Sequence, residues 1–198
     1  MNHRRESLSQ PLIFRTRRGQ LVAARQATVA DTFLLAEFLG RLSDRARHLR
    51  YMSPQAASAD VIWNEAVRMT RGHSPDHTTL VATIRRNDND EAVAVAELVC
   101  DRHDPTVGEI ALVVRDDQQR QGIGSFLLWH LARIAKRSGL IRLSASMLAE
   151  NSVMRHLIRT LELPYTATTS YGETQVLVAL AGHSEEGARA PSAEKWAA

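Results

Sequence analysis

Residues 109–125 read EIALVVRDDQQRQGIGS and contain the most informative pattern of the sequence. Its first part, residues 109–114, is apolar on both faces except at its first residue, which is typical of a central buried strand. The chain then turns, and two glycines lead into an amphipathic helix expected over residues 125–137. Glycines at this spacing let the backbone approach a ligand closely, and the N–H groups of the first helical turn favour a phosphate or pyrophosphate.

The loop does not fit two common nucleotide-binding motifs. A dinucleotide fingerprint would need a third glycine where Leu127 stands, and a P-loop would need Gly-Lys-Ser or Gly-Lys-Thr, which is absent. What remains is Q-x-x-G-x-G, from Gln119 to Gly124, between a hydrophobic strand and an amphipathic helix. A glycine pair alone is equally consistent with a tight turn that needs a positive φ.

The remaining patterns predict one α+β domain with a central sheet. Its 198 residues, 44% of them hydrophobic, suffice for a single core. The expected strands are 12–15, 21–25, 78–84, 92–99, 109–114, 141–147 and 174–180, and the expected helices are 33–42, 59–71, 125–137 and 151–161. We expect the domain to span residues 11–181, after a flexible segment 1–10 and before a disordered tail 182–198 rich in Ala, Gly, Ser, Glu and Pro.

Charge and cysteine content exclude several classes of partner and site. The 25 basic residues are scattered among 22 acidic ones, so we expect no nucleic-acid partner. The single cysteine, Cys100, excludes an internal disulfide and fits a cytoplasmic protein. No apolar run approaches the roughly 20 residues that span a bilayer, and residues 1–10 are polar, so we expect no membrane association. The oligomeric state stays open, a homodimer included.

In this context the Q-x-x-G-x-G loop resembles the acetyl-CoA signature of the GCN5-related N-acetyltransferases (GNAT). The resemblance runs from about Leu12 to Leu180. Residues 42–51, LSDRARHLRY, resemble the Pat-like subgroup of bacterial protein lysine acetyltransferases. This resemblance implies a GNAT fold, a mixed and mostly antiparallel sheet flanked by helices and splayed to admit acetyl-CoA.

The resemblance also implies a set of cofactor-binding residues. The backbone of Val113 and Val114 would bind the pantetheine arm and polarise the thioester carbonyl, where negative charge develops in the transition state. Asn151 would bind the pantetheine or the far end of the cofactor, although an ordinary helix cap explains this residue equally well. Many members carry a tyrosine seven residues later as a general acid, and Ile158 stands there instead. The pyrophosphate would be held by Gln119, Arg120, Gln121, Gly122, Ile123, Gly124 and Ser125.

The acceptor amine must lose a proton before it attacks, because a lysine amine has a reference pKa near 10.4. Glu109 is the first candidate for the base, since desolvation at the start of an apolar strand would raise the pKa of its carboxyl. The alternative is a solvated carboxylate at a strand end. Glu97 is the second candidate, because it interrupts an apolar run in the preceding strand.

Other polar residues are expected to have ordinary structural roles. No cysteine or carboxylate lies at ligand spacing from the histidines, so we expect no metal site and loop histidines that face water. The expected loop histidines are His73, His77 and His103. A solvated helix face is expected for Arg45, Arg47 and Arg50.

These observations predict direct transfer of an acetyl group from acetyl-CoA to a primary amine in a ternary complex, without a metal. The subgroup resemblance favours a protein lysine as acceptor. One alternative is an acetyltransferase for a small-molecule amine. The other is a non-catalytic protein that binds or senses acyl-CoA, which the missing tyrosine motivates.

Overall fold

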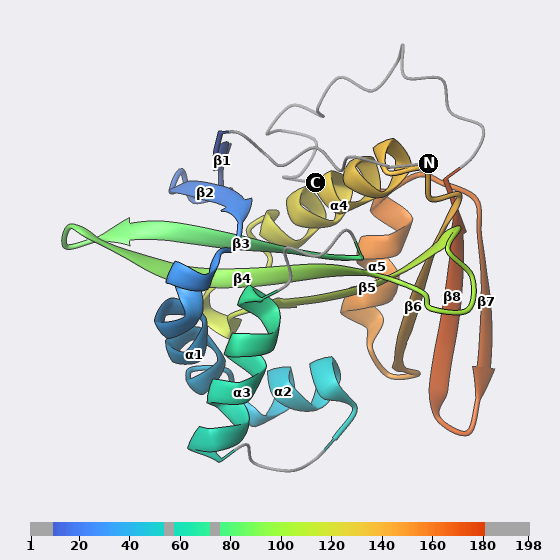
Figure 1. The fold of residues 1–198 in the computed structure, drawn as a ribbon, viewed down its shortest axis with the longest axis horizontal. Helices are drawn as coiled ribbons and strands as arrows, with labels where there is room; N and C mark the ends of the chain where they lie inside the picture. The colour runs from blue at the N-terminus through green and yellow to red at the C-terminus, as the bar shows by residue number, and fades with distance from the viewer. Residues whose placement is uncertain (1–9, 54–57, 72–75, 181–198) are drawn as a thin grey trace.

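The computed structural model describes residues 10–53, 58–71 and 76–180. The expected flexible segment before residue 10, the expected tail after residue 181 and His73 lie outside these ranges. The described chain forms one eight-stranded sheet in the order β1-β2-β3-β4-β5-β6-β8-β7 (Figure 1). Only the pair β5–β6 is parallel; the other six pairs are antiparallel.

Seven of the eight strands were predicted to within three residues at each end. The strand Tyr165–Ser170 was missed. All its residues are exposed, so its sequence lacks the alternation of apolar and polar residues that marks a half-buried strand. The strands are β1 (Leu12–Arg15), β2 (Leu21–Gln26), β3 (His77–Arg86), β4 (Asn89–Cys100), β5 (Val107–Val114), β6 (Arg142–Leu148), β7 (Tyr165–Ser170) and β8 (Glu173–Ala179).

The first helical region is divided into more pieces than the sequence indicated. Asp31 accepts the backbone N–H of Thr28 at 2.7 Å in a capping box, and a short 3-10 turn precedes the helix. A separate helix then begins because Ser43 Oγ accepts the N–H of Ala46 at 3.1 Å. The helices are η1 (Val29–Asp31), α1 (Thr32–Gly40), α2 (Asp44–Tyr51), α3 (Ala59–Thr70), η2 (Asp116–Gln118), α4 (Ile123–Arg137) and α5 (Ser152–Thr160). In the described ranges, none is long and apolar enough to cross a membrane.

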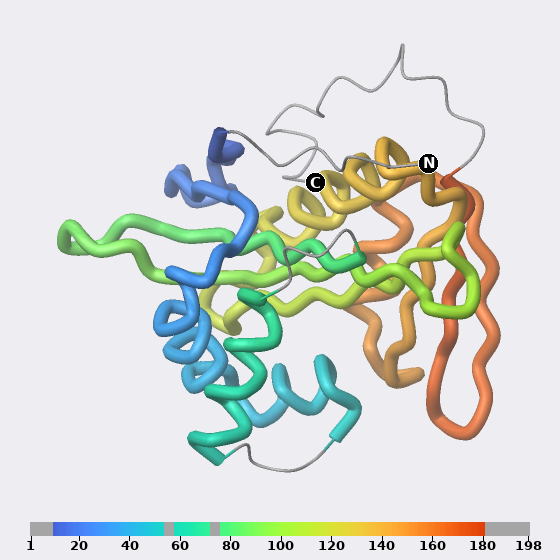
Figure 2. Tube along the Cα trace, in the orientation of Figure 1, coloured from blue at the N-terminus to red at the C-terminus, as the bar shows by residue number. Residues whose placement is uncertain are grey.

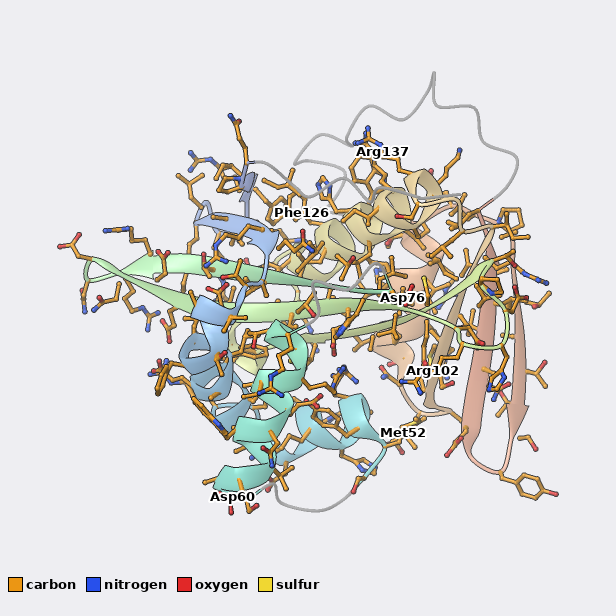
Figure 3. All side chains as sticks on the ribbon, in the orientation of Figure 1. Met52, Asp60, Asp76, Arg102, Phe126 and Arg137 are labelled. Carbon is orange, nitrogen blue, oxygen red and sulfur yellow. The ribbon has the colours of Figure 1, made fainter. Side chains whose placement is uncertain are left out.

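Helices cover both faces of the sheet. Helices α4 and α5 pack on one face, and α1, α2 and α3 pack on the other (Figure 1). Figure 3 shows this separation, because Phe126 on α4 and Met52 after α2 lie on opposite sides of the central strands. The turn of the long hairpin β3–β4 projects at the end of the molecule opposite β7 and β8 (Figure 2).

Gly108 in β5 is the one strand glycine at which a side chain would collide with the core. A Cβ there would lie 2.6 Å from Leu98 and 2.7 Å from Leu140, and both leucines are buried. Gly108→Val is therefore expected to lower the free energy of unfolding by about 1–3 kcal/mol through overpacking. Urea unfolding measures this change.

A glycine with open space provides the control. A Cβ on Gly40, the last residue of α1, would meet nothing within 4 Å. Gly40→Ala should leave stability unchanged or raise it, because alanine favours the helix. Equal stability of Gly108→Val and the wild type would show that the packing around β5 is looser than described.

Candidate active site

The candidate site begins where β5 and β6 separate. The two strands pair only at Val107–Arg142, Gly108–Leu143 and Glu109–Ser144, although β5 continues to Val114. Over residues 110–114 no described strand therefore pairs with this side of β5. A strand edge of this kind offers backbone N–H and C=O groups to a ligand.

A cavity of about 450 Å³ opens at this separation, within the size range of small-molecule and cofactor sites. Its walls come from β5, the following loop, the first turn of α4, one face of α5 and the inner side of α2. The lining residues are Arg17, Ala46, Leu49, Arg50, Leu112, Val113, Val114, Gln118, Gln119, Arg120, Gly122, Ile123, Gly124, Ser125, Asn151, Ser152, Val153, Met154, His156, Leu157 and Thr160.

The start of α4 is built to accept an anion. Gly122 caps the helix with φ of 85°, a left-handed conformation that favours glycine. The first intrahelical bond runs from Phe126 N–H to Gly122 O at 3.0 Å, so the three preceding N–H groups have no acceptor within the helix. These groups line the cavity and can bind a phosphate.

The turn between β1 and β2 braces this loop. The backbone N–H of Arg18 donates to Gln121 Oε1 at 3.2 Å, and that of Arg17 donates to Gln121 O at 3.4 Å. Gln121 is thus a buried support and does not line the cavity, unlike the other residues predicted for the loop. Gln119 Nε2 donates to Val114 O at 3.1 Å and ties the loop to the end of β5.

Helix α5 forms the opposite wall. Asn151 caps this helix, since its Oδ1 accepts the N–H of Met154 at 3.0 Å, and it also lines the cavity. Asn151 can therefore both cap α5 and bind a ligand, because its amide nitrogen can still donate a hydrogen bond to a ligand. Ile158 is buried in the core away from the cavity, whereas His156 and Thr160 line it. No periodic pattern in the sequence had marked these two residues.

Glu109 is the last residue at which β5 pairs with β6. It is exposed, so the desolvation that we expected at this strand end is not observed. Its position explains this, because the strands part immediately beyond it. Glu109 occupies the sheet face that carries α1, α2 and α3, as does Glu97 on β4, since Glu97 pairs with Ala111 and strand side chains alternate.

Glu97 is almost fully buried, with 2% of its side chain exposed, and is surrounded by cations. Arg50 Nη2 contacts Glu97 Oε2, Arg68 Nη2 lies 2.9 Å from Glu97 Oε1, and His77 Nε2 lies 2.9 Å from the same oxygen. Burial alone would raise the pKa of Glu97, but the hydrogen bond from His77 and the two arginine charges outweigh it and hold the pKa at about 2.

Two of our expectations for neighbouring residues are therefore wrong. Arg50 does not lie on a solvated helix face: 13% of its side chain is exposed, and it lines the cavity. Arg47 is also largely covered, and its Nη1 donates to Leu39 O at 3.3 Å. His77 is the first residue of β3 and binds Glu97, whereas His103 is exposed in a loop as expected. The missed signal was the buried carboxylate, which requires cationic partners.

Within residues 10–53, 58–71 and 76–180, no three or more His, Cys, Asp or Glu side chains are grouped so that they could hold a metal ion.

Comparison with known proteins finds similar sequences. A family model described as the acetyltransferase (GNAT) family matches residues 43–162. The acetyltransferase Pat of Mycolicibacterium smegmatis is 39% identical over 66 residues, which cover 33% of this chain and 20% of that protein. The chain thus matches about a fifth of that curated relative.

Solved structures share the fold. The GNAT domain of PAT from S. lividans superposes with a TM-score of 0.72 at 23% identity, covering 87% of this chain and 98% of that one. A cAMP-binding acyltransferase from Mycobacterium smegmatis gives a TM-score of 0.55 at 27% identity over 85% of this chain and 47% of that one. Spermidine N-acetyltransferase from Vibrio cholerae, solved with CoA and spermine, gives a TM-score of 0.60 at 11% identity. This superposition covers 79% of this chain and 94% of that one.

Proposed function

The chain belongs to the acetyltransferase (GNAT) family, and on that premise we propose that it transfers the acetyl group of acetyl-CoA to the side-chain amine of a protein lysine. The observation that carries this proposal is the separation of β5 from β6 directly beyond Glu109, with the cavity that it opens. The resemblance of residues 42–51 to the Pat-like protein lysine acetyltransferases, together with the match to the acetyltransferase Pat, supports the lysine acceptor.

In this proposal the donor lies along β5. The pyrophosphate binds the N–H groups of Ile123, Gly124 and Ser125 at the start of α4, where the helix dipole favours negative charge. The pantetheine follows the backbone of Val113 and Val114 toward the point where the strands part. This direction places the thioester near Glu109.

Glu109 then acts as the base. It takes a proton from the acceptor ammonium, the neutral amine attacks the thioester carbonyl carbon, and the C–S bond breaks with its electron pair leaving on sulfur as the CoA thiolate. The nitrogen then loses its second proton, which solvent passes to the thiolate, so the products are the amide and the free CoA thiol. Its exposure on the face that carries α2 gives an acceptor access to it. Glu97 is the poorer base, because a carboxylate with a pKa of about 2 binds protons weakly.

The acceptor is a single cationic side chain in this proposal and not a polyamine. The cavity is lined by three arginines, Arg17, Arg50 and Arg120, and by no carboxylate of the described residues, so it offers no acidic group to bind a multiply charged amine. Labelled acetyl-CoA incubated with the protein and a lysate separates the acceptor classes. Label in protein supports the proposal, and label only in small molecules would assign a small-molecule acceptor.

Binding of acetyl-CoA is expected to stabilise the folded chain. A ligand at 100 times its Kd stabilises the state that it binds by about 2.7 kcal/mol. For a chain of this length, that free energy corresponds to a rise in Tm of roughly 5–10 °C. Scanning calorimetry with acetyl-CoA measures it, with NAD and ATP as ligands that should leave the Tm unchanged. Absence of a shift at millimolar acetyl-CoA would contradict the assignment of the cleft.

A further inference from the structure

A buried carboxylate lies beside the acceptor side of the cleft and takes no part in the steps proposed above. Glu97 pairs in register with Ala111, and Glu109 lies two residues away along β5 on the same face. Diagonal neighbours of this kind in adjacent strands are about 7–8 Å apart. The charges that surround Glu97 therefore act on the space in front of Glu109.

The groups around Glu97 come from three elements. Arg50 on α2 and Arg68 on α3 are cations that contact its carboxylate, and His77 on β3 donates a hydrogen bond to it. Glu65 is the second anion of the cluster and pairs with Arg68 at 2.7 Å. The negative charges of the two carboxylates thus equal the positive charges of the two guanidinium groups. Glu97 is the carboxylate that contacts Arg50, which lines the cavity.

The balance matters because the proposed acceptor arrives as a cation. A lysine ammonium with a pKa near 10.4 is charged at neutral pH. At an effective dielectric constant of about 40, an uncompensated positive charge about 7 Å from this ammonium group would weaken the binding of the acceptor roughly tenfold. Without Glu97, the guanidinium of Arg50 would be such a charge.

We propose that Glu97 is a positioning residue for acyl transfer: it holds Arg50 and the end of α2 against the sheet, and it cancels the arginine charge so that a cationic amine can reach Glu109. This role rests on the proposed function. It assigns Glu97 to acceptor binding, with no contact to the donor.

The test compares Glu97→Gln with the wild type and with the double variant Glu97→Gln/Arg50→Gln, which restores the charge balance. Three quantities are measured: the apparent KM for the protein fraction of a lysate as acceptor, the Kd for CoA by calorimetry, and the slow hydrolysis of acetyl-CoA without an amine. Water is a neutral acceptor, so hydrolysis reports the donor site free of repulsion between cations.

Glu97→Gln should raise the acceptor KM roughly tenfold, and added salt should reduce this effect. Its Kd for CoA and its hydrolysis rate should stay within about twofold of the wild type. The double variant should recover most of the acceptor KM. The double variant also controls for loss of stability, because replacing both partners of a buried ion pair destabilises a protein less than removing only one partner.

Glu91→Gln is the matched control. Glu91 lies on the same strand, and it is likewise bound by an arginine, with Arg115 Nη1 at 2.6 Å. It is six residues from Glu97, about 20 Å along the strand. Its acceptor KM should equal that of the wild type.

Three results would overturn the positioning role while leaving the proposed function intact. They are an unchanged acceptor KM in Glu97→Gln, an equal loss of CoA binding and hydrolysis that indicates a purely structural role, and a double variant no better than the single one. A wild-type chain that binds CoA but transfers no label would instead overturn the proposed function itself.

Discussion

Glu109→Gln should lower kcat/KM for acetyl transfer at pH 7 by at least a hundredfold, the loss typical of a missing general base. Glutamine has nearly the same shape but cannot accept the proton of the amine. The loss should shrink as the pH rises toward the pKa of the acceptor, because more of the amine is then already neutral. A pH–rate profile of both proteins from pH 7 to 10 measures this.

Binding and folding separate this role from a structural one. Glu109 is exposed, so the glutamine variant should keep the Tm of the wild type and its rise with acetyl-CoA. Glu173→Gln is the control, because Glu173 is also an exposed glutamate at the start of a strand, in β8. A Glu109→Gln variant with the wild-type rate would exclude it as the base and direct attention to His156, which lines the cavity.

Gly122→Glu should weaken binding of acetyl-CoA by at least a hundredfold. The new carboxylate would enter the space beside the first turn of α4 and repel the pyrophosphate. Gly122 also has φ of 85°, which a side chain tolerates poorly. Calorimetric titration with CoA measures the loss, and the rise in Tm with acetyl-CoA should disappear.

Gly172→Glu controls for backbone strain and charge. Gly172 has φ of 83°, and a Cβ there would meet nothing within 4 Å, in the turn between β7 and β8. This variant should bind CoA as the wild type does. Tight binding by Gly122→Glu would mean that the loop has only a structural role.

The path of the chain through β5 and α4 could be predicted because local patterns determine it. An apolar strand, a glycine pair and an amphipathic helix follow one another within residues 109–137, and each has its own sequence signal. The parting of β5 from β6 could be expected only from the family resemblance. It depends on pairing between segments more than 30 residues apart, which no local pattern encodes.

The surroundings of Glu97 show why the rest of the site could not be predicted. The sequence marked Glu97 as a polar residue in an apolar strand, but its partners lie 20 to 47 residues away on three elements. Arg50 was assigned to a solvated face because α2 is dominated by charged residues. A buried carboxylate needs compensating charge, so its presence predicts cationic partners without identifying them.

The most direct test of the central claim follows both products of the reaction at once. Wild-type protein and Glu109→Gln are incubated with acetyl-CoA and a dialysed lysate, and free CoA thiol and Nε-acetyl-lysine are quantified together. The account predicts that the wild type forms one Nε-acetyl-lysine per thiol released and that Glu109→Gln forms both at least a hundredfold more slowly. Binding of acetyl-CoA without any thiol release above the background rate would contradict it and identify a protein that only senses acyl-CoA.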